Sequence, residues 1–158
     1  AYDLPFTSHP NSNTYNLVVG YESIQDSLIK MTNSLQNYAA AGSIISNSSD
    51  LIHWNELLHT GQLIKEETFE LMKTRYASRV HPIYGEIEYG YGVLFKKGQS
   101  EIENGALGYS PGFVSCCYYF LDSKCNLVVL ENIAQGMPDF KKSFKTQIQL
   151  LELVKSIK

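Results

Sequence analysis

Ser27 is the clearest candidate for a nucleophile, because Lys30 follows it three residues later. On a helix, this spacing places an amine one turn from a hydroxyl and can activate the serine for acyl transfer. The pattern is short and often arises by chance, and no second positioned base is visible near it. No G-x-S-x-G turn, which exposes the nucleophile of another hydrolase class, occurs in the sequence. We therefore interpret Ser27 and Lys30 as solvated surface residues.

The histidines and carboxylates do not form a recognisable catalytic arrangement. The four histidines are His9, His53, His59 and His81. His53 and His59 are six residues apart, a spacing that does not bring them together on one helix face. Asp50 and Glu131 are explained by helix capping and by solvation at a strand end. We interpret each histidine as a structural or surface residue, because single residues without a motif carry little functional information.

The three cysteines are Cys116, Cys117 and Cys125. Cys116 and Cys117 are neighbours in an expected strand, so their side chains point to opposite faces and only one can face Cys125. We interpret them as small apolar residues of a sheet, with a disulfide to Cys125 as the alternative. The cysteines and scattered histidines supply too few closely spaced ligands for a metal site, and no cofactor is predicted.

Composition indicates one globular domain over residues 1–158. Hydrophobic residues make up 44% of the chain and charged residues 18%, and the formal net charge is −3. This charge gives no reason to expect nucleic acid or an anionic membrane as a partner. We also expect no membrane span and no signal peptide, because the sequence lacks a long apolar run and a basic start followed by an apolar core.

Residues 89–132 contain three runs that predict strands. The first is Tyr89–Lys97, and the other two, Phe113–Leu121 and Leu127–Glu131, are joined by a short polar turn that predicts an antiparallel hairpin. The Gly105–Gly112 run between them contains three glycines and a proline, which leave the backbone bare and sharply turned. Such an edge of a sheet is a place where a ligand can approach the main chain.

Helices are predicted on both sides of these strands. Asn47 followed by Asp50 predicts a capped helix start, and Gly61 predicts its end. A second helix is expected over residues 66–75. The third begins at Pro138 and runs to Ile157 with an apolar stripe of Phe140, Phe144, Ile148, Leu151 and Val154.

The remaining segments carry weaker signals. Residues 16–21 predict a short strand, and residues 76–88 predict a loop around Pro82 and Gly85. Two interpretations of residues 22–38 stay open. The spacing of Ile24, Leu28, Met31 and Leu35 favours a helix, whereas the resemblance described next favours a strand and loop.

Several runs of the sequence resemble the penicillin-binding and class C β-lactamase-like serine hydrolases. The glycine-rich run that ends in Pro111-Gly112-Phe113 is similar to the family pattern G-H-x-G-x-x-P-G-F, and Val128–Asn132 is similar to VVVLSN. The segment AAGSIISNSSDLIHWNELLHTGQLIKEETFELM resembles AAGGLxSTAxDLxKWxxALxxGxLLSxExLxxM, and NLVVGY resembles NLAxGY. One departure is Ala106, which stands where the family has His or Lys.

The resemblance implies an α+β fold: an antiparallel sheet of about three or more strands, two short helices and a C-terminal helix packed on the sheet. It also implies acyl transfer to a serine nucleophile on amide or ester substrates. In the family, the nucleophile and its Lys and Tyr partners lie upstream of the matched runs. We therefore expect residues 1–158 to be the C-terminal half of such a hydrolase, inactive alone and without a catalytic residue of its own; the alternative is a non-catalytic binding or scaffolding relative.

The expected substrate-binding residues are Ala106, Gly108 and Tyr109. By the resemblance, the Tyr109 N–H is one of two oxyanion donors, on an edge strand antiparallel to residues 113–121. The implied partner of the complete protein is a small-molecule or peptidoglycan-like substrate, and the implied location is periplasmic or secreted. Uncovered apolar surface at Ile44, Ile45, Val93 and Phe95 predicts self-association through edge strands.

Overall fold

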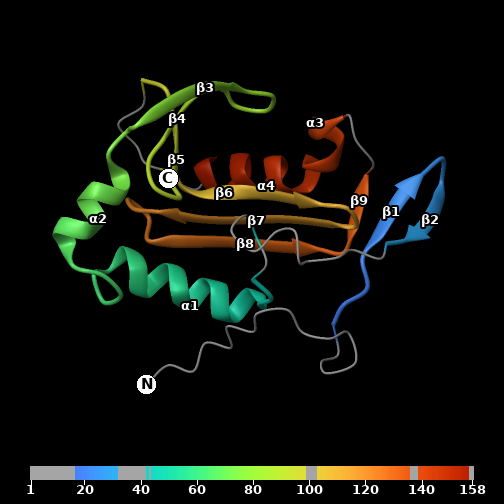
Figure 1. Cartoon of the computed structure of the whole chain (residues 1–158), viewed down its shortest axis with the longest axis horizontal. Coiled ribbons are helices and arrows are strands. Elements are labelled where there is room, and N and C mark those ends of the chain that lie inside the picture. The colour runs from blue at the N-terminus through green and yellow to red at the C-terminus, as the bar shows by residue number, and fades with distance from the viewer. Residues whose placement is uncertain (1–16, 32–41, 43, 99–102, 136–138, 157–158) are drawn as a thin grey trace.

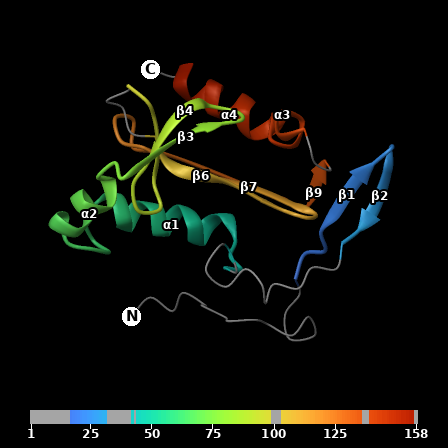
Figure 2. The same cartoon turned by 45° about the horizontal axis from the view of Figure 1, so that its top comes forward.

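The computed structural model describes residues 17–31, 42, 44–98, 103–135 and 139–156. A sheet of β6 (Glu103–Ser110), β7 (Phe113–Phe120) and β8 (Cys125–Glu131) forms its centre, with β7 in the middle and antiparallel to both neighbours. The C-terminal helix covers one face and helix α1 (Ser48–His59) covers the other (Figures 1 and 2). The predicted hairpin and the predicted α+β class are both confirmed.

Two clusters of the core lie between the sheet and the C-terminal helix. Side chains on one face of β7 are fully buried, because alternate residues of a strand point to the same side. One cluster joins Val114 to Ala134 and Phe144, and a second joins Cys116 and Tyr118 to Leu151. The predicted apolar stripe of the helix therefore packs on the sheet.

The C-terminal helical segment consists of two helices, α3 (Phe140–Ser143) and α4 (Lys145–Ser156), rather than one. Asp139 caps α3, because its side chain accepts a hydrogen bond from the Lys142 N–H at 3.1 Å. Phe144 leaves helical geometry between them, with φ −102° and ψ 20°. The predicted end residues Pro138 and Ile157 lie outside the described residues.

α1 (Ser48–His59) begins and ends where the sequence predicts. The Asn47 side chain accepts a hydrogen bond from the Asp50 N–H at 2.9 Å and donates one to the Asp50 carboxylate at 2.8 Å, so the two side chains together cap the helix start. Gly61 has φ +75°, a conformation that glycine adopts without strain. α2 (Glu66–Lys73) follows and is shorter than the predicted helix by two residues, because Thr74 is already extended.

Three predictions for residues 76–97 are wrong. Residues 76–88 are mostly a hairpin of β3 (Ala77–His81) and β4 (Gly85–Tyr89), since Pro82 and Gly85 mark only its turn. The predicted strand Tyr89–Lys97 is broken by the turn at Gly90–Gly92, and only β5 (Leu94–Lys96) continues it. Val93 and Phe95 are buried, not exposed as expected.

The ambiguous segment is a hairpin in its described part. β1 (Tyr21–Ile24) pairs with β2 (Ser27–Lys30), and Gln25 and Asp26 form the turn with positive φ angles of 47° and 63°. β1 also runs parallel to β9 (Ile133–Gln135). The predicted strand at residues 16–21 begins only at Tyr21, and residues 32–38 lie outside the described part.

Candidate functional site

β6 is an edge strand of the central sheet and carries all three predicted site residues. Leu107 pairs with Cys116, Gly108 with Ser115 and Tyr109 with Val114 in the antiparallel register. The predicted extended conformation of residues 105–109 beside Phe113–Phe120 is therefore confirmed. No strand pairs with the other side of β6 in the part of the chain that the structure describes.

The side chains of β6 alternate between the two faces of the sheet. Leu107 and Tyr109 pack with the cluster of Val114 and Phe144 on the α4 face. Ala106 and Gly108 therefore lie on the α1 face, where the Ala106 side chain is exposed. The predicted site residues thus do not share one face: Tyr109 contributes its backbone to the edge, and its ring belongs to the core side.

Gly108 has a steric reason to lack a side chain. A Cβ at this position would lie 2.4 Å from the Ser115 hydroxyl oxygen and 3.8 Å from the Ser115 Cβ. Only the Ser115 hydroxyl blocks a side chain at position 108, so replacing Ser115 with alanine makes room for one. The Gly108 backbone is thereby kept bare on the face that α1 covers, as the glycine-rich run predicts.

The backbone of Tyr109 is directed away from β7. Ser110 and Phe113 flank a two-residue turn and are paired in register, which makes them a hydrogen-bonded pair of the ladder. The two kinds of pair alternate along antiparallel strands, so the Tyr109 N–H points out of the ladder. That this N–H holds an oxyanion stays a prediction.

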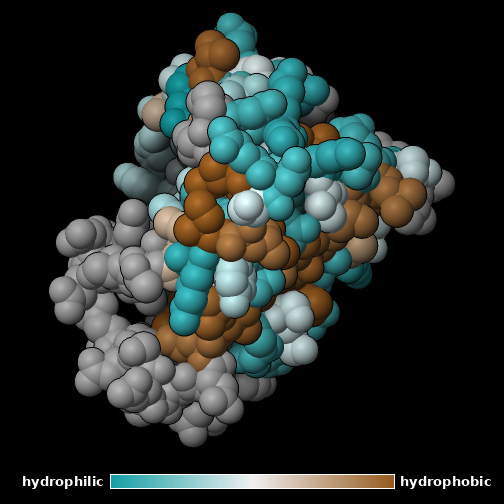
Figure 3. Space-filling model, turned by 90° about the vertical axis from the view of Figure 1, so that its right-hand side faces the viewer, coloured by the Kyte–Doolittle hydropathy of each residue, from teal (hydrophilic) through white to brown (hydrophobic). Residues whose placement is uncertain are grey.

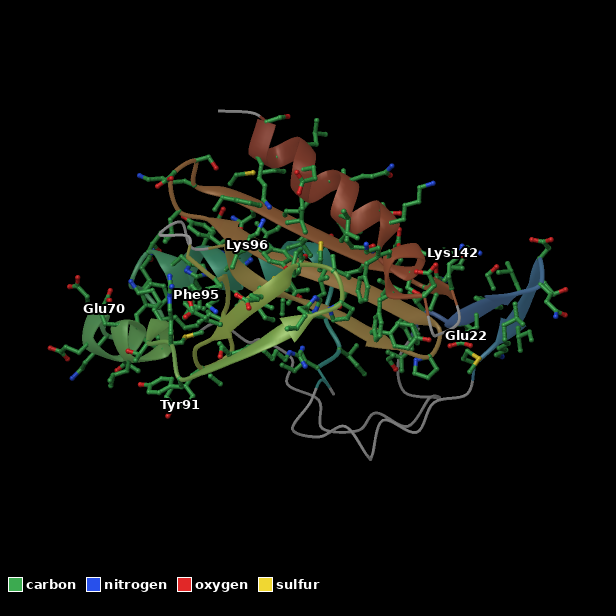
Figure 4. The ribbon with its side chains drawn as sticks, turned by 90° about the horizontal axis from the view of Figure 1, so that it is seen from above. Glu22, Glu70, Tyr91, Phe95, Lys96 and Lys142 are labelled. Atoms are coloured by element: carbon green, nitrogen blue, oxygen red, sulfur yellow. The ribbon has the colours of Figure 1, made fainter. Side chains whose placement is uncertain are left out.

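The Tyr109 ring is anchored at its hydroxyl group. This hydroxyl donates a hydrogen bond to the Glu22 carboxylate at 2.9 Å, which ties β6 to β1. Glu22 lies at the β1 end of the sheet, whereas Tyr91 and Phe95 lie near the opposite end (Figure 4). The sequence gives no signal for this contact, because the two residues are 87 positions apart.

Three of the family-like runs meet at the Pro111-Gly112 corner. Gly112 has φ +84°, and a Cβ there would lie 2.8 Å from the Gly20 carbonyl carbon. Asn132 donates a side-chain hydrogen bond to the Val19 carbonyl at 3.0 Å and accepts one at its own carbonyl from the Tyr21 N–H at 2.9 Å. Gly112 and Asn132 thus hold the NLVVGY run against the β6–β7 turn and the end of β8. Sequence reasoning did not identify this structural role.

The structure makes Cys116 and Cys117 poor nucleophiles. All three cysteines are free, so the alternative of a disulfide is wrong. Burial raises the pKa of Cys116 to about 12 and also raises the pKa of Cys117, although the Asn55 amide donates a hydrogen bond to the Cys117 sulfur at 3.2 Å. A thiol with a raised pKa stays protonated at neutral pH and reacts poorly.

The histidines occupy structural positions where the structure describes them. His59 stacks on Tyr119 with ring centroids 4.5 Å apart, and burial, followed by the charge of Lys73, lowers the His59 pKa to about 4. His81 accepts a hydrogen bond from the Ile83 N–H at 3.1 Å in the β3–β4 turn, and its pKa is lowered by burial and by Arg79. His53 is exposed on α1, and His9 lies outside the described residues.

Ser27 and Lys30 do not form a helical serine–lysine pair. Both lie exposed on strand β2, and residues three apart on a strand point to opposite faces. Within the described ranges, no three His, Cys, Asp or Glu side chains come together in a way that could hold a metal ion.

No helix that the structure describes is both long and apolar enough to span a bilayer.

Comparison of the sequence with protein-family models gives no match, and comparison with curated proteins gives no significant match. Solved structures do match. A D-amino acid amidase from Ochrobactrum anthropi SV3, in complex with D-phenylalanine, is 20% identical with a TM-score of 0.68, over 94% of this chain and 47% of its own. A penicillin-binding protein from Bacillus halodurans is 20% identical with a TM-score of 0.58, over 84% of this chain and 39% of its own.

An octameric penicillin-binding protein homologue from Pyrococcus abyssi is 22% identical with a TM-score of 0.64, over 89% of this chain and 32% of its own. The chain thus spans less than half the length of each of these three proteins. All three belong to the penicillin-binding-protein and β-lactamase-like serine hydrolase superfamily. The resemblance seen in the sequence is therefore confirmed at the level of the fold: this chain has the fold of part of those hydrolases.

Proposed function

We propose that residues 1–158 are the C-terminal half of a β-lactamase-like or penicillin-binding-protein-like serine hydrolase. The observation that carries the proposal is β6, an edge strand with a bare glycine that leads into the Pro111-Gly112 corner. The fold shared with an amidase and with penicillin-binding proteins supports it. The reaction is acyl transfer from an amide or ester to a serine.

The proposed task of β6 is to hold the reacting carbonyl. The Tyr109 N–H supplies one oxyanion donor, and Gly108 lets the substrate approach the main chain closely. A donor of this kind is worth about 3 kcal/mol in the transition state. Because the donor is a backbone group, it survives the replacement of His or Lys by Ala106.

The proposal places the nucleophile upstream of the matched runs, as in the family, and assigns no catalytic residue to residues 1–158. The 158-residue chain alone should therefore not hydrolyse nitrocefin or a p-nitrophenyl ester above background. Hydrolysis that disappears in a Ser27→Ala variant would show that this chain carries its own nucleophile, and it would overturn the proposal. A fluorescent penicillin should instead label the natural protein covalently if that protein extends to a catalytic serine.

A second candidate is a non-catalytic relative that keeps the fold for binding or scaffolding. Ala106 favours it, because an exposed methyl group can neither carry charge nor move a proton. Absence of penicillin labelling in the natural protein, unchanged in an Ala106→His variant, would favour this candidate. Labelling that appears only in Ala106→His would indicate a hydrolase that lost its activity together with the His or Lys side chain at position 106.

The family resemblance also supports a substrate class, a location and self-association. The substrate of the whole protein is a small molecule or a peptidoglycan-like compound, and the protein acts in the periplasm or outside the cell. Fractionation of cells that express the natural gene tests the location directly. Self-association is also expected, and the homologue from Pyrococcus abyssi is itself octameric.

A further inference from the structure

Glu22 lies on a backbone that is fixed on both sides. Its strand β1 is the middle strand of a three-stranded sheet, in which Glu22 pairs with Ile29 of β2 and with Ala134 of β9. Figure 3 views this end of the molecule, where hydrophobic side chains lie between hydrophilic ones. Ala134 is fully buried in the core cluster against which Tyr109 packs. Paired residues of neighbouring strands point to the same face, so the half-buried Glu22 side chain is directed to the side that holds Tyr109.

The Tyr109 side chain is held at its ring and at its tip. The ring packs against the core cluster of Val114, Ala134 and Phe144. The hydroxyl donates a hydrogen bond to Glu22 Oε1 at 2.9 Å. A hydrogen bond to a carboxylate is roughly twice as strong as one between neutral groups. The position of the Tyr109 side chain is therefore set by β1 as well as by the core.

The backbone of Tyr109 depends on this side chain more than its neighbours depend on theirs. Tyr109 and Val114 form a non-hydrogen-bonded pair, so the N–H and C=O of Tyr109 take no part in the β6–β7 ladder. Gly108 and Ser110, on either side, do belong to ladder-bonded pairs. A side chain that is fixed at both ends restricts rotation about its own Cα atom. The direction of the Tyr109 N–H is therefore coupled to the bond with Glu22.

The start of β1 also holds the turn that follows Tyr109. A Cβ on Gly20 would lie 2.5 Å from the Phe113 ring and 2.9 Å from the Gly112 carbonyl oxygen, so only a bare backbone fits there. Residues 20–22 therefore contact the β6–β7 hairpin at two points. Gly20 contacts the turn, and Glu22 contacts the Tyr109 hydroxyl.

We propose that Glu22 is a positioning residue for acyl transfer, which acts through the Tyr109 hydroxyl to direct the Tyr109 N–H at the reacting carbonyl oxygen. This inference rests on the function proposed for β6. The negative charge on that oxygen develops only in the transition state, so loss of Glu22 lowers the maximum rate and leaves substrate affinity nearly unchanged. A purely structural contact would change stability alone.

Nuclear magnetic resonance of the 158-residue chain tests the positioning without any reaction. Residual dipolar couplings and ¹⁵N relaxation give the orientation and the order parameter of the Tyr109 N–H. In Glu22→Ala, the order parameter should fall from about 0.85 towards about 0.6, whereas Glu22→Gln keeps an acceptor oxygen and should stay near the wild-type value. Tyr84→Phe is the matched control, because it removes another hydroxyl from the same side of the sheet, one that bonds the Tyr118 hydroxyl at 3.0 Å. An N–H that keeps its orientation and order in Glu22→Ala overturns the proposal.

Labelling of the natural protein by a fluorescent penicillin tests the effect on the reaction. The maximum labelling rate should fall about tenfold in Glu22→Ala and in Tyr109→Phe, with a half-saturating concentration within about twofold of wild type. The double variant should be no slower than either single variant, because both remove one bond. Glu22→Gln should recover most of the rate, and Tyr84→Phe should keep it.

The two ways of failing are distinct. A wild-type protein that is labelled, and a Glu22→Ala variant that is labelled at the same rate, would overturn the role of Glu22 and leave the proposed function intact. A natural protein that is not labelled at all would overturn the proposed function, and the role of Glu22 in acyl transfer would fall with it.

Discussion

Gly105 and Gly108 lie three residues apart on β6 and are crowded for different reasons. A Cβ on Gly105 would lie 2.2 Å from the Cys117 carbonyl oxygen and 2.5 Å from the buried Tyr118 ring. A Cβ on Gly108 would meet only the Ser115 hydroxyl closely. The α4 face of β6 is thus bounded by backbone and core, whereas the α1 face is bounded by a small polar group that can be changed. A methyl group on the α4 face would therefore disturb the core, whereas one on the α1 face would disturb only Ser115.

The largest effect is expected from Gly105→Ala. Neither the Cys117 carbonyl nor the Tyr118 ring can move without distorting the core, so we expect a loss of about 4 kcal/mol in the free energy of unfolding. Urea denaturation followed by circular dichroism measures it. A loss below about 1 kcal/mol would show that this face is less rigid than the contacts indicate.

The helix that covers the α4 face offers a matched pair of leucines. Leu151 is 1% exposed and Leu153 is 56% exposed on the same helix. Leu151→Ala should cost about 3 kcal/mol because it leaves a cavity against Cys116 and Tyr118, and Leu153→Ala should cost under about 0.5 kcal/mol. Similar losses for both variants in urea denaturation would contradict the packing of α4 on the sheet.

On the α1 side, stability should depend on pH through His59. Its pKa falls from 6.5 to about 4 on folding, so the unfolded chain binds more protons between these values. Stability is therefore complete above about pH 6.5 and decreases as the pH falls towards 4. We expect about 1 kcal/mol for this group, well below the full shift because the ring is half exposed. His59→Phe keeps the stacking on Tyr119 and should remove this part of the pH dependence; equal pH profiles for both proteins would exclude His59 as its source.

A small effect is expected at Gly108, and a second substitution should reverse it. Gly108→Ala should cost about 1 kcal/mol, because only the Ser115 hydroxyl must move. Adding Ser115→Ala removes that oxygen and should restore most of the loss, which a double-mutant cycle measures. Absence of rescue would mean that the backbone of β6, rather than Ser115, opposes the new methyl group.

The sequence predicted the features that depend on local chemistry. Asn47 and Gly61 mark the ends of α1, and alternating apolar residues mark β7 and β8. The β3–β4 hairpin was missed because Pro82 and Gly85 look the same in a turn as in a longer loop. The β1–β2 hairpin stayed undecided because apolar residues four apart suit one helix face and also a hairpin with a two-residue turn.

For the candidate site, the sequence located the strand but not its surroundings. The glycine-rich run and its Pro-Gly corner predicted the β6 edge, since both require unusual backbone freedom. The contacts of Tyr109 with Glu22, of Gly108 with Ser115 and of Asn132 with Val19 join distant parts of the chain. No local pattern encodes such contacts, so only the fold could reveal them.

The central claim, that the Tyr109 N–H of β6 stabilises an oxyanion, is tested most directly by replacing this amide with an ester in the natural protein. The replacement removes the N–H and keeps the Tyr109 ring and its bond to Glu22. The rate of covalent labelling by a fluorescent penicillin should fall about 100-fold or more, whereas the same replacement at Leu107 should change it little. An unchanged rate at Tyr109, or no labelling of the unmodified protein, would contradict the assignment of β6 to an acyl-transfer site.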